Sequence, residues 1–224
     1  MPRPRDPAEL RCTRRFEFVA MREGRQFIAG CDEAGRGALL GPLYAAAVIL
    51  GPAIAIRGID DSKKLTPCER EWLAQKIRAK ALAWQVVSVT AKEVDALNVY
   101  QASRQAMLRA LKALSPVPDF ILTDAMPLFE NGQEFCIPHR AIIHGDALSI
   151  SVAAASILAK VARDEHLTNL DGVFPRYGLA QNKGYGTPDH LAALAQFGPC
   201  SEHRKTYQPV KDYMLPLFPF MPSA

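Results

Sequence analysis

An unbroken apolar run at residues 43–50 is the feature that most restricts how this chain can fold. The run reads LYAAAVIL and has a Gly-Pro pair on either side, at 41–42 and 51–52. A short continuous apolar stretch that ends at turn residues predicts a strand buried on both faces. Such a strand needs a sizeable core around it, and 224 residues are enough for one substantial α/β domain.

Other patterns place further strands and helices around this run. Strands are predicted at residues 27–31, 84–89 and 120–122 and within 140–144. Capping boxes at 66–69 and 90–93 predict one helix to about residue 80 and another over 94–114 with a break near Asn98. Further helices are expected near 16–23, at 149–167 and at 187–198. The order indicates one α/β domain with a helical C-terminal part.

Composition excludes several classes of protein and leaves nucleic-acid binding open. The net charge of +4 and the pI of about 8.8 are compatible with a nucleic-acid partner without diagnosing one. The five cysteines form no Cys-x-x-Cys pair, so a zinc site is not expected and a reducing compartment is favoured. No apolar run approaches the roughly 20 residues that span a membrane. We therefore predict a cytoplasmic protein without a membrane partner, and we expect a monomer.

Carboxylates stand where predicted strands end. Asp32 and Glu33 follow the first strand, Asp124 ends the fourth, and Asp146 lies between a strand and the long helix. Neighbouring strand ends lie about 5 Å apart, so these groups can converge, and cations would have to neutralise their repulsion. Oxygen ligands select Mg²⁺ or Mn²⁺, and two such ions can hydrolyse a phosphodiester. The alternative is four separate surface carboxylates that cap helices and turns.

A glycine-rich loop follows the first two carboxylates. The segment GCDEAGRG at 30–37 begins like a P-loop, but Arg36 and Gly37 stand where Lys and Ser or Thr belong. Gly35 and Gly37 would let backbone approach a ligand, with Arg36 as a phosphate-binding fork. A tight turn between strands is the alternative interpretation.

Six segments in family order make the chain resemble bacterial ribonuclease HII, from about residue 27 to 209. They are AGCDEAGRG at 29–37, DSKKL at 61–65, TDA at 123–125, GDAL at 145–148 leading into AAASILAKV at 153–161, NKGYGT at 182–187, and GPC at 198–200 with His203-Arg204. Ala125 stands where glycine is frequent in that family, and His144 where lysine is more common.

The resemblance implies a ribonuclease-H-like mixed sheet flanked by helices, with a small helical C-terminal region. It divides the chain into an arginine-rich extension (1–26), a catalytic domain (27–210) and an apolar, proline-rich tail (211–224). It implies cleavage of RNA in RNA–DNA hybrids and 5′ of single ribonucleotides in duplex DNA, leaving 3′-hydroxyl and 5′-phosphate ends. Two Mn²⁺ or Mg²⁺ ions would be held by Asp32, Glu33, Asp124 and Asp146.

The same resemblance assigns substrate contacts. Gly35, Arg36 and Gly37 would recognise the ribonucleotide through its 2′-hydroxyl and adjacent phosphate, and Tyr185 would pack on its sugar. Lys63 and Lys64 would hold backbone phosphates. From spacing alone, Ser156, Lys160 and Arg163 share one face of the long helix. That face is expected either to contact phosphate or to be a solvated surface.

The sequence is also compatible with two other functions and with one further partner. A nuclease of the same fold acting on DNA junctions, or a nucleic-acid-binding protein without catalysis, would fit part of the pattern. The Gly-Arg-Gly loop and Tyr185 suit a 2′-hydroxyl better, and four intact carboxylates favour catalysis.

Near the C-terminus, Leu215, Leu217 and Phe218 resemble a short sliding-clamp-binding motif. A tail that is disordered or packed on its own domain is the alternative.

Overall fold

The structure is a computed structural model that describes residues 12–214. A five-stranded mixed sheet forms its centre. The strand order is β3-β2-β1-β4-β7. β1 pairs antiparallel with β2, and β2 with β3, whereas β1–β4 and β4–β7 are parallel. The strands are β1 (Ile28–Ala34), β2 (Leu43–Ile49), β3 (Ala83–Val89), β4 (Phe120–Asp124) and β7 (His139–Ile142). The predicted α/β class is confirmed.

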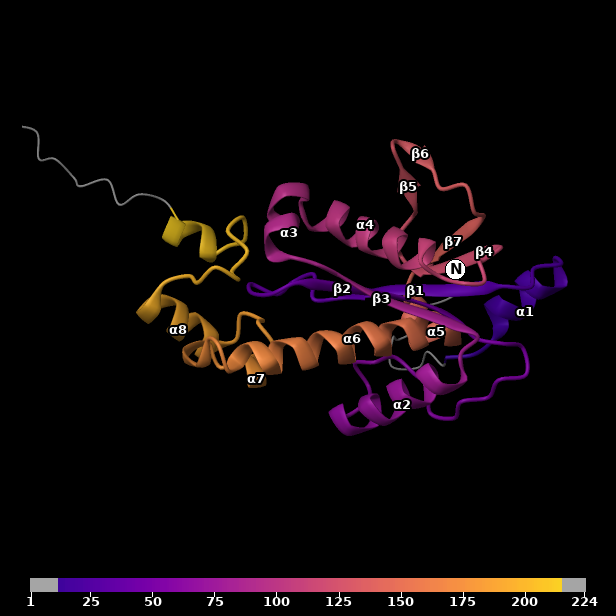
Figure 1. Ribbon diagram of the computed structural model, residues 1–224, viewed down its shortest axis with the longest axis horizontal. Coiled ribbons are helices and arrows are strands. Elements are labelled where there is room, and N and C mark those ends of the chain that lie inside the picture. The colour runs from indigo at the N-terminus through magenta and orange to yellow at the C-terminus, as the bar shows by residue number, and fades with distance from the viewer. Residues whose placement is uncertain (1–11, 215–224) are drawn as a thin grey trace, which may run out of the picture.

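Helices cover both faces of this sheet (Figure 1). α3 (Ala91–Leu97) and α4 (Val99–Lys112) lie on one face, and α2 (Pro67–Lys80) and α6 (Ile150–Asp171) on the other. α1 (Arg15–Arg22) packs at one end, and the short α5 (Gly145–Leu148) precedes α6. The helical C-terminal region lies at the far end of α6 from α1 (Figure 1). It comprises the 3₁₀ turn Pro175–Tyr177, α7 (Leu179–Asn182), α8 (Pro188–Phe197) and the 3₁₀ helix Val210–Met214.

Local signals account for most of these elements. β2 is the predicted buried run: only Tyr44 among its residues is even partly exposed. Both capping boxes form, with Thr66 and Glu69 starting α2, and Thr90 and Glu93 starting α3. Asn98 has φ 63° and accepts a hydrogen bond from the next helix, so the predicted break separates α3 from α4.

Two expectations need correction. The first strand runs to Ala34 because its pairing with β2 continues to Ala34 opposite Tyr44. Asp32 and Glu33 therefore lie inside the strand and not after it. The hairpin of β5 (Phe129–Glu130) and β6 (Gln133–Glu134) was not predicted, since two-residue strands leave no periodic pattern.

Three further expectations concern a membrane span, the short first helix and the C-terminal motif. Among residues 12–214, no helix has the length and apolar character needed to cross a membrane. The short helix expected near residues 16–23 is α1, and its residues Glu17 and Ala20 are buried against the core. Leu215, Leu217 and Phe218 of the suggested clamp motif lie outside the described residues.

Candidate active site

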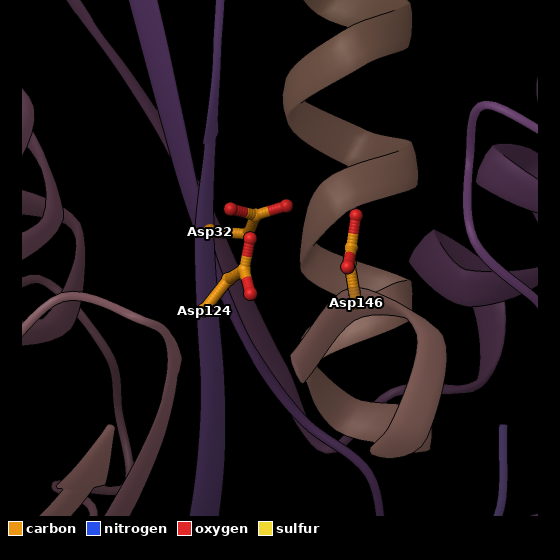
Figure 2. Close-up of side chains that lie close together, drawn as sticks. All are labelled: Asp32, Asp124 and Asp146. Atoms are coloured by element: carbon orange, nitrogen blue, oxygen red, sulfur yellow. The ribbon is translucent and has the colours of Figure 1, made fainter. Parts of the chain in front are cut away.

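Three carboxylates from three elements meet beside the sheet (Figure 2). Asp32 lies within β1, Asp124 ends the neighbouring parallel strand β4, and Asp146 lies in α5, directly after β7. One oxygen from each lies within 4.8 Å of the others. The main-chain N–H of Gly145 donates to Asp124 Oδ1 at 2.8 Å, which ties α5 to the end of β4. The sequence prediction that these three converge is consistent with this geometry.

The electrostatics of the cluster favour a bound cation. Burial raises the pKa of Asp32 well above its usual range, and Glu33 and Asp124 raise it further. Burial and Asp146 also raise the pKa of Asp124. Among the described residues, Lys63 is the single cation bonded to the cluster. Its Nζ lies 2.8 Å from Asp146 Oδ2. One ammonium cannot neutralise three close carboxylates, so ionisation of all three requires further positive charge.

Glu33 lies next to this cluster but is not one of the three converging groups. Its Oε1 is 3.3 Å from Arg36 Nη1, and its Oε2 is buried without a hydrogen-bond partner in the described part of the chain. Burial raises the pKa of Glu33 to about 7, although Arg36 opposes the shift. A buried carboxylate oxygen without a partner is costly unless an ion or a donor reaches it.

Close packing of α6 on β1 places the helix behind these carboxylates. A Cβ on Gly30 would lie 2.0 Å from the carbonyl carbon of Ser151, so only glycine permits this approach. Further along α6, Ser156 is buried beside Asp32, and its hydroxyl lies 3.0 Å from that of Ser62. Ser156 is thus near the carboxylates, although its hydroxyl is not solvent-facing.

Arg163 corrects the expectation of an exposed helix face. Its side chain is fully buried, and its guanidinium donates to the carbonyls of Pro42, Leu40 and Lys183 at 2.9–3.2 Å. Helical spacing placed it with Ser156 and Lys160, but α7 and the loop between β1 and β2 cover that face. Arg163 therefore binds two loops together and offers no donor to solvent.

The loops joined by Arg163 carry the predicted recognition residues. Gly35 has φ 96°, and a Cβ there would meet Arg163 Nε at 2.1 Å; Arg36 and Gly37 are exposed. The ring of Tyr185, in the second loop, lies under the cations of Arg163 at 5.2 Å and Lys160 at 5.7 Å. Lys160 also pairs with Asp164 at 2.7 Å, so a phosphate would compete with that carboxylate.

Other predicted residues are placed less tightly. Lys64 lies 3.7 Å from Asp60. Ala125 and His144 leave β4 and β7 with φ of 48° and 59°, a conformation that glycine adopts without strain.

Arg204 and Tyr207, which contact the Gly-Arg-Gly loop, were not predicted as site residues. Arg204 belongs to a segment that carried the resemblance, but no spacing or periodicity indicated its contacts.

Comparison with known proteins decides the family. Residues 29–210 match the family described as ribonuclease HII. The chain belongs to the ribonuclease HII family. It is 50% identical over 203 residues to ribonuclease HII of Solibacter usitatus, which covers 91% of this chain and 87% of that protein.

Solved structures agree with this membership. Ribonuclease H2 from Pyrococcus horikoshii has a TM-score of 0.71 and 28% identity, covering 83% of this chain and 96% of the other. Ribonuclease HII in its complex with PCNA from Archaeoglobus fulgidus has a TM-score of 0.66 and 27% identity. The match covers 81% of this chain and 95% of the other. The predicted ribonuclease-H-like fold is confirmed. As a ribonuclease HII, the protein is a ribonuclease H endonuclease acting on RNA–DNA hybrids.

Proposed function

We propose that this ribonuclease HII cleaves the phosphodiester on the 5′ side of a ribonucleotide, in hybrids and at single ribonucleotides in duplex DNA, leaving 3′-hydroxyl and 5′-phosphate ends. Two divalent ions would be held by Asp32, Glu33, Asp124 and Asp146. The observation that carries the proposal is the convergence of Asp32, Asp124 and Asp146 within 4.8 Å.

The donor set fits hard divalent ions. The converging ligands are all carboxylate oxygens, which Mg²⁺ and Mn²⁺ prefer. Burial raises the pKa of both Asp32 and Asp124, and neighbouring carboxylates raise it further. Glu33 follows Asp32 in β1, and its Oε2 is buried without a hydrogen-bond partner among residues 12–214, so it could supply a fourth oxygen. When bound, two such ions would lower the pKa of the attacking water and neutralise charge on the departing 3′-oxygen.

The chain's own groups would position the duplex around this cluster. Lys63, 77% exposed in its side chain, can release Asp146 to bind a phosphate. Arg36 and Gly37 lie exposed on the loop after β1. A groove of about 860 Å³ between α2 and α6 is lined by residues that include Arg70, Lys160, Lys183 and Tyr185. Tyr185 lines this groove together with the acidic residues Glu71, Asp164 and Glu165.

A DNA duplex with one ribonucleotide tests the proposal directly. Purified protein with Mn²⁺ or Mg²⁺ is expected to cut on the 5′ side of the ribonucleotide, and with chelator it should not cut. End-labelled products on a sequencing gel give the position, and their extension by a polymerase shows the 3′-hydroxyl. Cleavage of an all-DNA junction, with none at the ribonucleotide, would favour the alternative nuclease. Binding without metal-dependent cleavage would favour a non-catalytic role.

Tyr185→Ala is expected to reduce activity on a single embedded ribonucleotide more than activity on a long hybrid. A long hybrid offers many binding registers, whereas a single ribonucleotide depends on each contact to its sugar. A loss of one aromatic packing contact is worth about 1–3 kcal/mol, or roughly five- to 150-fold in kcat/KM. Steady-state kinetics on both substrates provide the measurement. Equal losses on both would show that Tyr185 has no role in discrimination.

We also propose that the tail binds a sliding clamp through Leu215, Leu217 and Phe218. Support comes from the motif and from the Archaeoglobus fulgidus structure, which pairs a ribonuclease HII with PCNA. A peptide of residues 211–224 is expected to bind the cognate clamp with micromolar affinity in calorimetry. In the full chain, Leu217→Ala with Phe218→Ala should abolish clamp binding and leave nuclease turnover unchanged. No heat of binding at high micromolar peptide would remove the proposal.

A further inference from the structure

The turn that carries the Gly-Arg-Gly segment contains one peptide whose orientation its own sequence does not determine. Gly35 to Ala38 form a four-residue turn, closed by the Ala38 N–H donating to the Gly35 carbonyl at 3.3 Å. The two commonest turn types differ by a flip of the central peptide, here the one between Arg36 and Gly37. Glycine in the third position tolerates both states. Contacts from outside the turn must therefore select one.

Two side chains from the segment after α8 provide those contacts. The carbonyl oxygen of Arg36 accepts from Arg204 Nη1 at 2.9 Å and from the Tyr207 hydroxyl at 2.8 Å. The two donors are themselves in contact, since Arg204 Nη1 lies 3.3 Å from the Tyr207 oxygen. Arg204 is fully buried, and its Nε donates to the carbonyl of Gly41 at 3.1 Å. A rigid pair of donors thus holds one carbonyl on the protein side of the turn.

This arrangement determines where the next N–H points. The peptide after Arg36 is trans, because the cis bonds within residues 12–214 are Ser115–Pro116 and Gln208–Pro209. In a planar trans peptide the C=O and N–H point in opposite directions. The N–H of Gly37 therefore points away from Arg204 and Tyr207. Gly37 is exposed, a Cβ there would meet nothing within 4 Å, and its N–H has no protein acceptor in the described part of the chain.

We propose that Arg204 and Tyr207 are positioning residues that keep the Gly37 N–H turned outward as a donor to the 2′-oxygen of the bound ribonucleotide. The inference rests on the proposed recognition of that sugar by the Gly-Arg-Gly loop. The opposite peptide orientation would direct a carbonyl at the substrate. It would also leave the Tyr207 hydroxyl and Arg204 Nη1 without their shared acceptor, which is unfavourable for a buried guanidinium.

Tyr207→Phe tests the inference with little change in packing. The variant keeps the ring that lies 5.2 Å from the Arg204 guanidinium and removes only the hydroxyl. Tyr177→Phe is the matched control, since it removes a hydroxyl that donates to Gly198, outside the turn. Both changes are made in an Asp124→Asn background, which is expected to bind duplex without cutting it. Fluorescence anisotropy then gives Kd for a duplex with one ribonucleotide and for the same duplex in DNA alone.

The readout is the ratio of the two Kd values, which a general loss of stability would not change selectively. Tyr207→Phe is expected to lower the preference for the ribonucleotide by about three- to tenfold, the effect of one hydrogen bond. Tyr177→Phe should leave the preference intact. If the parent prefers the ribonucleotide and a folded Tyr207→Phe protein keeps that preference in full, the positioning role is wrong. If the parent shows no preference, the proposed sugar recognition fails, and this inference fails with it.

Discussion

Asp32→Asn or Asp124→Asn is expected to reduce hydrolysis by at least about a thousandfold, because each change removes a charged ligand from the proposed two-ion site. Both carboxylates belong to the cluster within 4.8 Å, and asparagine keeps their size. Single-turnover cleavage at saturating Mn²⁺ measures the loss without interference from product release. Near-normal turnover in either variant would refute the metal-site assignment.

Binding and stability serve as controls for that result. Duplex affinity is expected to stay or to increase, since less negative charge repels the phosphates. The pKa of Asp32 is raised in the folded protein. The folded state therefore becomes less stable as the pH rises from the pKa of Asp32 in the unfolded chain through its pKa in the folded protein. In chelator at neutral pH, Asp32→Asn should therefore melt at the same or a higher temperature than the parent. A large fall in melting temperature would instead attribute lost activity to misfolding.

Arg163→Met is expected to lower the free energy of unfolding by about 3–5 kcal/mol, because it leaves buried carbonyls without donors. The three acceptors belong to Leu40, Pro42 and Lys183, so the loop after β1 and the loop before Tyr185 both lose their common anchor. Urea denaturation followed by circular dichroism in chelator gives the change without a contribution from bound metal.

Lys160→Met is the matched control for Arg163→Met. It makes the same replacement in the same helix, but Lys160 is partly exposed and pairs with Asp164 near the surface, a contact worth at most about 1 kcal/mol. The Arg163 variant should be much less stable than the Lys160 variant. Comparable small losses in both would mean that the buried guanidinium bonds contribute little beyond ordinary packing.

Much of the fold could be predicted because its signals are local. The apolar run of β2, the capping boxes of α2 and α3, and the break at Asn98 each depend on residues close together in sequence. The convergence of Asp32, Asp124 and Asp146 followed from their places at or near strand ends, together with the family resemblance. Pairing sets the end of β1, so the position of Asp32 inside the strand could not be predicted from the strand's own residues.

The sequence by itself indicated the layered α/β fold, the family resemblance and the three carboxylates that converge beside the sheet. The tertiary structure decided which cations are available around them. Arg163 has the helical spacing of a surface residue, yet loops distant in sequence cover it; Arg204 reaches Arg36 across 168 positions. Periodicity describes one element at a time, whereas burial and hydrogen-bond partners depend on what packs against it. For that reason the sequence indicated the chemistry of the site, and only the packed chain showed which arginines hold its loops in place.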